Sequence, residues 1–316
     1  MSAATNYVAF ILTALTALLL PPLLLATIRK TKARMQNRLG TRLFQPYYDL
    51  LKFLAKAETV SSTTSWVFRS TAVANLVTVI LIAFLTPWLS YGPHFRDASD
   101  LFLIVYLFGL ARFMTVLAAL DAGSVFGGFG ASREVTLALL IEPGVVLALA
   151  SLACVAHTSS LGSIMSYSLV DNPVLYTQPI MWLLAGSGLF LASVAELSRM
   201  PVDDPTTHLE LTMVHEAMIL ENSGRNLALT EYTHVLKMAV LLGLSGQCFL
   251  HSVADLWSAN DLVRGAASIA IIFALTLVIA LMESLIVKLQ WRKVPEFISY
   301  AVGMSLLCFL IAVGVR

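Results

Sequence analysis

Residues 265–287 decide the fold class; they read Gly-Ala-Ala-Ser-Ile-Ala-Ile-Ile-Phe-Ala-Leu-Thr-Leu-Val-Ile-Ala-Leu-Met-Glu-Ser-Leu-Ile-Val. A helix needs about 20 mostly apolar residues to cross the hydrocarbon core of a bilayer. This run is long enough, and its single ionisable residue is Glu283. We therefore predict a transmembrane helix here, with one carboxyl group inside it.

Seven further segments have the same character, so the sequence predicts an all-α integral membrane protein with about eight transmembrane helices. Polar stretches that contain proline, glycine and asparagine separate them. We treat residues 1–316 as a single membrane domain. The predicted spans are 6–28, 71–91, 100–120, 134–156, 178–198, 233–251, 265–287 and 295–314.

The composition agrees with a lipid environment. Of the 316 residues, 58% are hydrophobic and 12% are charged, and the mean hydropathy is +0.81. A soluble chain usually carries about 25% charged residues. The net charge of +1 gives no reason to expect a nucleic-acid partner. No basic segment precedes the first apolar stretch, so we expect a retained helix rather than a signal peptide.

The cysteines give no sign of a cofactor held by this chain. Cys154, Cys248 and Cys308 all lie inside apolar runs, and none belongs to a C-x-x-C pair. We therefore expect no zinc or other metal site, no iron–sulfur cluster and no disulfide framework. If electrons flow near this protein, another subunit carries the clusters.

Lysine and arginine in the connecting segments predict the orientation. With eight spans, both termini lie on one side, and segments 29–70, 121–133, 199–232 and 288–294 share the other. Those segments and their margins hold fifteen lysines and arginines, against three on the side of the termini. Because basic loops face the cytoplasm, we expect a multi-pass protein with both termini outside.

The first cytoplasmic segment contains a predicted amphipathic helix. Residues 44–56 read Phe-Gln-Pro-Tyr-Tyr-Asp-Leu-Leu-Lys-Phe-Leu-Ala-Lys. Leu50, Leu51 and Leu54 recur at helical spacing, which favours a helix that lies at the membrane interface. This helix is either a surface anchor or a docking surface for cytoplasmic partners. The candidate docking residues are Arg34, Arg38, Arg42, Gln45, Asp49 and Lys52.

Some ionisable residues fall within or beside the spans, where a charge is expensive. They are Arg112, Glu142, Glu196, Lys237 and Glu283. Glu142 directly precedes Pro143, which removes a backbone donor and frees a carbonyl one turn back. Glu196 and Glu283 lie toward the cytoplasmic ends of their helices. Lys237 is the weakest candidate, because its long side chain can reach the interface.

The three carboxyls support two interpretations. A row of buried carboxyls that change protonation state is what a proton relay requires. Alternatively, each carboxyl pairs with a cation and only holds helices together. The cations available for such pairs are Arg112, Arg133, Arg199 and Lys237.

The densest polar segment, 199–232, lies between the fifth and sixth spans. Thr206 or Thr207 is placed to cap a predicted helix that runs to about Leu220. His208 and His215 are seven residues apart, so they share a face of that helix, two turns apart. Polar packing and protonation chemistry near neutral pH are both compatible with these histidines.

Two motifs are incomplete. His215-Glu216 opens the metalloprotease pattern H-E-x-x-H, but Ile219 stands where the second histidine is required. The glycine-rich stretch 121–130 lacks the preceding strand and the final G-K-S/T of a phosphate loop. We expect a flexible loop there, with Ser132 capping the next helix and Glu134 favourably placed at its N-terminus.

Three stretches carry a resemblance to a known family. The first, at 38–52, reads Arg-Leu-Gly-Thr-Arg-Leu-Phe-Gln-Pro-Tyr-Tyr-Asp-Leu-Leu-Lys, and the second, at 130–142, reads Gly-Ala-Ser-Arg-Glu-Val-Thr-Leu-Ala-Leu-Leu-Ile-Glu. The third, at 196–205, reads Glu-Leu-Ser-Arg-Met-Pro-Val-Asp-Asp-Pro. It is followed by Glu210-Leu211 and Glu221-Asn-Ser-Gly224. In these motifs the chain resembles the quinone-chamber (H-type) membrane subunit of respiratory complex I and its relatives in group 4 membrane-bound NiFe hydrogenases. The resemblance covers nearly the whole chain.

Two further stretches are more similar to the hydrogenase branch, which includes formate hydrogenlyase subunit 4 and component C of hydrogenase-4. They are Ala-Ala-Leu-Asp-Ala-Gly-Ser at 118–124 and Met-Glu-Ser at 282–284. The chain departs from the family at Thr206 and His208, where acidic residues are usual, and in a longer stretch that contains His215-Glu216. These departures fall where the family lines its quinone chamber, so quinone binding stays an open alternative.

The resemblance implies a membrane subunit of an oxidoreductase complex in a bacterial or archaeal cytoplasmic (inner) membrane, without catalysis of its own. It implies partners that carry iron–sulfur clusters and a NiFe centre, namely hydrogenase-like large and small subunits and an iron–sulfur subunit, together with antiporter-like membrane subunits. Redox chemistry in that arm would drive proton or sodium translocation through this chain. The candidate coupling residues are Glu142, Glu196, Glu283, Arg133, Arg199, Asp203, Glu210, Glu221, His208, His215 and Glu216. A quinone-reducing complex I subunit, a passive membrane anchor and a free-standing transporter are the alternatives.

Overall fold

The computed structural model describes residues 3–89, 99–166, 179–204, 213–252 and 261–314. Within these ranges the regular elements are helices. They are α1 (Ala3–Met35), α2 (Gln45–Ala55), α3 (Trp66–Leu85), α4 (Leu101–Asp121), α5 (Val125–Ala156), α6 (Leu161–Ser166), α8 (Pro179–Glu196), α9 (His215–Ile219), α10 (Gly224–His251), α11 (Asp261–Leu285), the 3-10 turn η3 (Trp291–Lys293) and α12 (Val294–Gly314).

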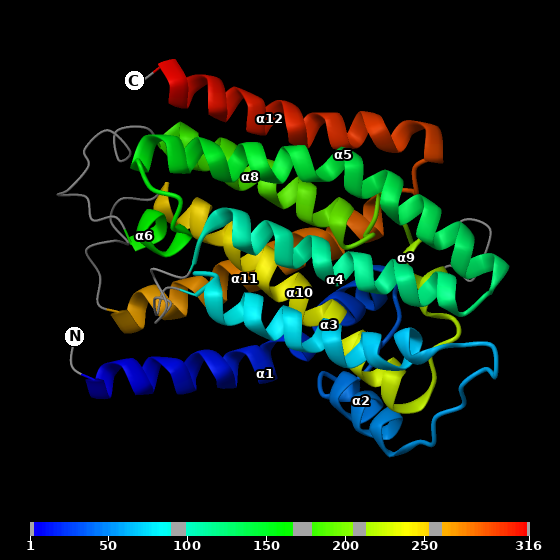
Figure 1. Ribbon diagram of the computed structural model, residues 1–316. Helices are drawn as coiled ribbons and strands as arrows, with labels where there is room; N and C mark the ends of the chain where they lie inside the picture. The colour runs from blue at the N-terminus through cyan, green and yellow to red at the C-terminus, as the bar shows by residue number, and fades with distance from the viewer. Residues whose placement is uncertain (1–2, 90–98, 167–178, 205–212, 253–260, 315–316) are drawn as a thin grey trace.

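Eight helices of the described ranges are long and apolar enough to cross a membrane, which confirms the predicted fold class. They are α1, α3, α4, α5, α8, α10, α11 and α12. The chain starts and finishes at the same end of this bundle (Figure 1). The short helices α2 and α9 lie at the opposite end, where the predicted basic segments meet.

Several spans differ from their predicted bounds, and the largest differences are at the starts of α5 and α10, which each begin nine residues before the predicted starts at 134 and 233. Helix α1 continues through the basic run to Met35 rather than stopping at residue 28. Helix α3 ends at Leu85 rather than at residue 91. Thr86 is extended, with φ −87° and ψ 142°, because the residue before a proline avoids the helical region and Pro87 follows.

The prediction of a flexible loop at 121–130 is wrong. Helix α5 begins at Val125 and incorporates the glycines of that stretch, with Ser124 at the N-cap position. Ser132 and Glu134 therefore lie well inside the helix rather than at its start. Glycine weakens an isolated helix by about 1 kcal/mol per residue, but here the helix packs against α4 and α9, and such tertiary contacts override local propensity.

The predicted amphipathic helix in the first cytoplasmic segment is confirmed as α2, and its location at the membrane interface stays a prediction. Pro46 occupies its first turn, where the missing backbone N–H has no helical partner to lose. One face of α2 packs against α1 and α10. The other face leaves Tyr48, Leu51 and Leu54 exposed, as expected for a helix that lies at a membrane surface.

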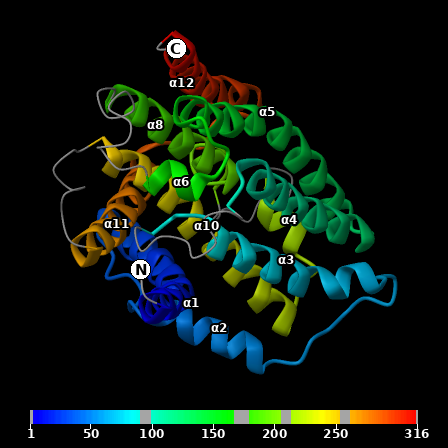
Figure 2. The same cartoon turned by 60° about the vertical axis from the view of Figure 1, so that its left-hand side comes forward.

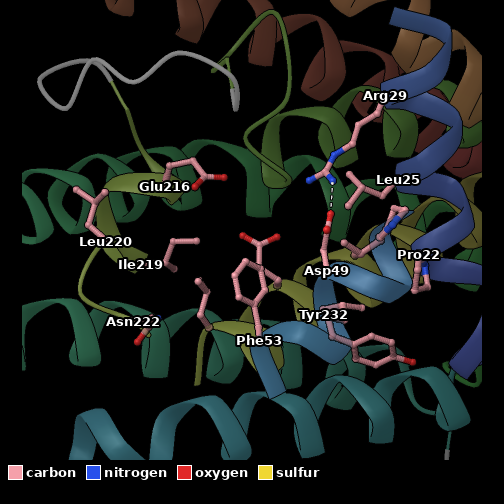
Figure 3. A pocket seen from close by; sticks show the side chains of 15 residues that line it. Pro22, Leu25, Arg29, Asp49, Phe53, Glu216, Ile219, Leu220, Asn222 and Tyr232 are labelled. Atoms are coloured by element: carbon pink, nitrogen blue, oxygen red, sulfur yellow. Dashed lines mark ion pairs between the residues drawn. The ribbon is translucent and has the colours of Figure 1, made fainter. Parts of the chain in front are cut away.

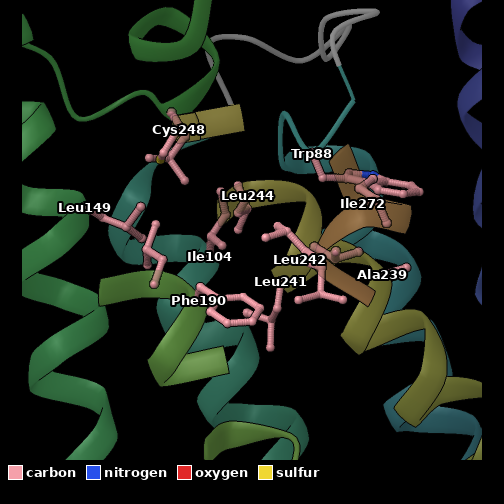
Figure 4. Close-up of a cluster of buried hydrophobic side chains, with 14 of the residues drawn as sticks. Trp88, Ile104, Leu149, Phe190, Ala239, Leu241, Leu242, Leu244, Cys248 and Ile272 are labelled. Atoms are coloured by element: carbon pink, nitrogen blue, oxygen red, sulfur yellow. The ribbon is translucent and has the colours of Figure 1, made fainter. Parts of the chain in front are cut away.

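Helix α10 forms the centre of the bundle, surrounded by α1, α2, α3, α8 and α11 (Figure 2). Ala239, Leu242 and Cys248 of α10 are fully buried against neighbours from other helices (Figure 4). Gly243 allows a close approach of α10 to Trp88, because a Cβ atom there would lie 2.7 Å from the Cβ of Trp88. Lys237, which lies among these buried positions on α10, is consequently surrounded mostly by protein, with its side chain 13% exposed.

Only part of the predicted helix between the fifth and sixth spans can be compared with the structure. Residues 205–212, which include Thr206, Thr207, His208 and Glu210, lie outside the described ranges. Helix α9 covers His215–Ile219, close to the predicted end. It packs on α5 at Gly130, where a Cβ atom would lie 2.8 Å from the carbonyl oxygen of Val214.

Candidate functional site

Arg112 is the centre of a buried cluster of charges drawn from four helices. Its guanidinium on α4 donates one hydrogen bond to Glu142 of α5 and another to Glu196 of α8. Its Nε atom lies 3.7 Å from Oε1 of Glu134 on α5. Lys237 of α10 completes this Arg112 cluster, with Nζ 2.6 Å from Oε1 of Glu196. Two cations therefore share three carboxyls within the bundle.

Burial differs sharply within the Arg112 cluster. The side chains of Arg112 and Glu196 are 8% and 7% exposed, whereas that of Glu142 is 48% exposed. Glu142 is thus a partly accessible member next to Pro143, not a fully buried one. Lys237 is 13% exposed and points inward, so the expectation that it reaches the interface is wrong. A carboxylate partner at 2.6 Å outweighs the pull of the membrane surface.

Glu283 organises a second buried cluster. Its side chain is 1% exposed, and Oε1 lies 3.2 Å from Nη1 of Arg199. Lys32 of α1 lies 3.3 Å from Oε2 of the same carboxylate and 3.8 Å from Oδ1 of Asp204. This Glu283 cluster ties α1 and the segment after α8 to α11. The predicted proximity of Arg199 to a buried carboxyl is confirmed.

Asp203 fixes the backbone between the two clusters. Oδ1 accepts from Nζ of Lys288 at 2.6 Å, and Oδ2 accepts from the backbone N–H of Val214 at 2.8 Å. Arg133 binds the residue before Val214, because its Nη1 donates a hydrogen bond to the carbonyl oxygen of Met213 at 3.1 Å. These bonds position α9, whose first residue is His215.

Three cavities follow one another through this part of the molecule. The first, of about 380 Å³, lies between α2 and the bundle and is lined by Phe53, Tyr232 and the Arg29–Asp49 ion pair (Figure 3). We call it the α2 cavity. The second, of about 260 Å³, contains the Glu283 cluster and is called the Glu283 cavity. The two cavities share Glu216 and Glu231 as wall residues.

The third cavity, of about 50 Å³, is lined by Arg112, Glu134, Glu196 and Lys237, and we call it the Arg112 cavity. It shares two wall residues with the Glu283 cavity, His215 of α9 and His234 of α10. The two imidazole rings are stacked, with centroids 4.2 Å apart and planes inclined by 27°. The stacked pair thus stands between the two buried clusters.

The environment of α9 changes the acidity of both its ionisable residues. Burial, followed by the nearby charges of Lys237 and Arg199, lowers the pKa of His215 to about 4. Burial, followed by the negative charge of Glu231, raises the pKa of Glu216 to about 7. His215 is therefore neutral at physiological pH, whereas Glu216 is poised to gain or lose a proton.

The structure brings together only part of the predicted coupling residues. Glu142 and Glu196 share the Arg112 cluster, and Glu283 and Arg199 belong to the second cluster. Glu221 is exposed in the turn after α9. Of the predicted docking residues, Arg34, Arg38, Arg42 and Lys52 are exposed at the end that carries α2, and Gln45 donates to Asp49 at 2.9 Å.

Four members of the site have roles that the sequence did not reveal. In the sequence, Lys32 was used only in the count of basic residues that predicts the orientation. Glu134 was expected at a helix N-terminus, and no role was predicted for Glu231 or His234. One usable signal existed: Glu231, His234 and Lys237 recur three residues apart on one span, which places them along one side of a helix. Lys32 gave no such signal, because its partner Glu283 is 251 residues away.

Spanning helices that hide ionisable groups from lipid define an integral membrane protein with a polar interior. The family described as NADH dehydrogenase matches residues 7–313, and the chain belongs to this family. It is 29% identical to formate hydrogenlyase subunit 4 of Escherichia coli, over 92% of this chain and 93% of that protein. It is 31% identical to hydrogenase-4 component C of the same organism, over 74% and 72% of the two chains.

More distant relatives extend the comparison. The chain is 27% identical to the H subunit of NADH-quinone oxidoreductase from Geobacillus thermodenitrificans, over 78% of this chain and 76% of that protein. Its fold matches a chain in the structure of the membrane-bound sulfane sulfur reductase, an archaeal respiratory membrane complex, with a TM-score of 0.79 over 97% of this chain and 99% of that chain at 19% identity. The resemblance stated from the motifs is thereby confirmed.

Proposed function

We propose that this chain is the membrane subunit of a complex I-like oxidoreductase of the group 4 hydrogenase or formate hydrogenlyase type. In this proposal it anchors a cytoplasmic redox arm and couples electron transfer to the movement of protons or sodium ions. The arm and its iron–sulfur clusters and NiFe centre belong to partner subunits. Electrons do not pass through this chain.

The pair of linked charge clusters is the observation that carries the proposal. A purely structural ion pair needs one partner for each charge, whereas Arg112 is shared among three carboxyls of two helices. Moving a proton onto one of these carboxyls frees the guanidinium to strengthen its bonds to the others. Such coupled groups convert a charge change at one place into a protonation change at another.

The position of the clusters supports coupling to an arm. The Glu283 cluster includes Lys32 in the last turn of α1, and Figure 1 shows that α1 ends at the end of the bundle where α2 lies. At that end the exposed arginines and lysines of segment 34–52 offer a basic surface to a docked partner. A change of charge in the arm acts on the buried clusters over a short distance in a medium of low dielectric constant.

Glu196→Gln tests the coupling role. In the intact complex in inverted membrane vesicles, we expect ion translocation to fall at least about tenfold, because the central carboxylate of the Arg112 cluster can no longer take up a proton. Electron transfer and assembly on a native gel should persist. Glu296→Gln, at an exposed carboxyl at the start of α12, is the control and should translocate normally.

Glu142→Gln provides a second variant that removes a half-exposed carboxyl of the same cluster and so disturbs the fold less. We expect the same loss of translocation. If both variants pump like the unmodified complex, the chain is a passive anchor and the coupling role is wrong.

The partners are tested separately by affinity purification of the tagged chain from native membranes in mild detergent, followed by mass spectrometry and metal analysis. Nickel, iron–sulfur proteins and a hydrogenase-like large subunit should purify with it. The same arm without nickel would favour a different electron acceptor. Purification of the chain alone would contradict the complex and favour a free-standing transporter.

The α2 cavity favours a second candidate, a quinone-reducing complex. It is large enough for a ring-sized ligand, its wall contains Phe53 and Tyr232, and Arg29 and Asp49 supply polar groups. A photoreactive quinone analogue should then label α2 or α10, and quinone analogues should inhibit electron transfer. Absence of both effects would exclude this candidate and leave the hydrogenase type.

A further inference from the structure

We propose that the stacked imidazoles of His215 and His234 carry protons between the Glu283 cavity and the Arg112 cavity. This inference rests on the proposed coupling function and names the step that joins its two charge clusters. The observation behind it is that the two cavities have only these two residues in common among the residues that line them.

The geometry of the pair suits a transfer element. Each ring forms part of the wall of both cavities, so a proton can reach a ring from one side and leave it on the other. The centroids are 4.2 Å apart. At this distance two positively charged rings would repel each other strongly, so the pair holds one extra proton at most. Because the pair of rings holds only one extra proton at a time, protons cross it one by one.

Carboxyls face the pair from both sides. Glu216, Glu231 and Glu283 line the Glu283 cavity, and Glu134 and Glu196 line the Arg112 cavity. The cations Arg199 and Lys237 stand on opposite sides and disfavour a lasting positive charge on the rings. The lowered pKa of His215, about 4, agrees with a ring that is neutral at rest.

A neutral imidazole has one nitrogen that accepts a proton and one that donates a proton. A proton from the Glu216 side binds the free nitrogen, which gives a transient imidazolium. The proton on the other nitrogen then leaves toward the Arg112 cavity, which restores a neutral ring in the opposite tautomer. Rotation of the ring or transfer in the reverse sense resets it. Charge is conserved at each step, and no electrons are transferred.

The test replaces both rings in the intact complex by His215→Phe together with His234→Phe. Phenylalanine preserves the stacked aromatic volume but has no nitrogen to accept a proton. We expect assembly and electron transfer to persist and ion translocation to fall at least about tenfold, because a positioned proton-transfer group typically contributes about 10²–10⁴-fold to a rate. His251→Gln is the control, because this buried histidine lies on the same helix α10 but lines neither cavity.

The outcomes separate this inference from the function on which it rests. Normal translocation in the double phenylalanine variant, with loss in Glu196→Gln, would overturn the histidine relay and leave the coupling function standing. Normal translocation in both would overturn both. If the double phenylalanine variant fails to assemble, ion translocation is measured instead in the double variant His215→Gln with His234→Gln, and its loss or persistence has the same meaning. Failure of both double variants to assemble would assign the pair a structural role and overturn the relay.

Discussion

At the scale of single residues, Arg112 shows why the charges of this chain are arranged in clusters. Removing one partner from a buried ion pair typically costs about 3–5 kcal/mol, because the other charge is left without compensation. Arg112 compensates Glu142 and Glu196 by hydrogen bonds and Glu134 at 3.7 Å. The same sharing that stabilises the folded chain makes the bond between Arg112 and each carboxyl depend on the protonation of the others.

Glu216 gives a pH-dependent prediction at this scale. Its pKa is raised from 4.5 to about 7, first by burial and then by Glu231, so the folded protein keeps a proton that the unfolded chain loses between these values. Stability is therefore lost as pH rises from 4.5 to 7 and stays lower above 7. Glu216→Gln removes this loss. We expect the variant to melt a few degrees higher than the unmodified complex at about pH 8 and equally at about pH 4.5.

Thermal unfolding followed by circular dichroism or by intrinsic fluorescence in detergent checks this expectation. An equal difference in melting temperature at both pH values would show that the substitution acts through packing rather than through ionisation of Glu216.

At the scale of elements, the short helix α9 is positioned by a glycine on its neighbour. A Cβ atom at Gly130 would lie 2.8 Å from the carbonyl oxygen of Val214 and 3.1 Å from Cβ of Ala217. Both atoms belong to the segment that carries His215. The contact between α5 and α9 thus determines where one ring of the stacked pair lies.

Gly130→Ala should consequently displace α9 and lower stability by about 1–3 kcal/mol, the usual cost of forcing an extra methyl group into a packed contact. Gly128→Ala is the matched control on the same helix, because no atom lies within 4 Å of its added Cβ. That substitution should raise stability by about 0.5–1 kcal/mol, since alanine favours the helix. Denaturation in mild detergent measures both effects, and equal effects would contradict this account of α9.

At the scale of the whole molecule, the eight spanning helices of the described ranges place the start of α1 and the end of α12 on one side of the bundle (Figure 1). Residues at the two ends of α12 offer a direct test of the predicted orientation. Arg292, just before this helix, and Gly314, at its end, are both exposed. Basic residues concentrate at the Arg292 end, which we expect to face the cytoplasm.

We predict that a membrane-impermeant maleimide labels Gly314→Cys in intact spheroplasts but labels Arg292→Cys only after the membrane is opened. The unmodified chain is the control for its own cysteines, of which Cys248 and Cys308 are buried. Labelling of Arg292→Cys alone in intact spheroplasts would reverse the orientation and place the docking surface outside.

The sequence alone determined the class of protein, the number of spans and most of the groups that carry charge into the bundle. Apolar length is a local property, so residues 265–287 specify a spanning helix without reference to any other segment. Glu196 and Glu283 stood out for the same reason, because an ionisable residue in an apolar run is conspicuous wherever the chain folds. The start of α5 was missed, because contacts with α4 and α9 outweigh the helix-breaking tendency of its glycines.

Only the tertiary structure decided which charges meet. Lys32 and Glu283 are 251 residues apart, and Arg112 rather than Arg133 forms the ion pair with Glu142. The stacking of His215 on His234 likewise joins two elements whose spacing in the sequence predicts nothing about their contact. Pairing between side chains on different helices depends on the packing of the whole bundle, and no local pattern in the sequence encodes it.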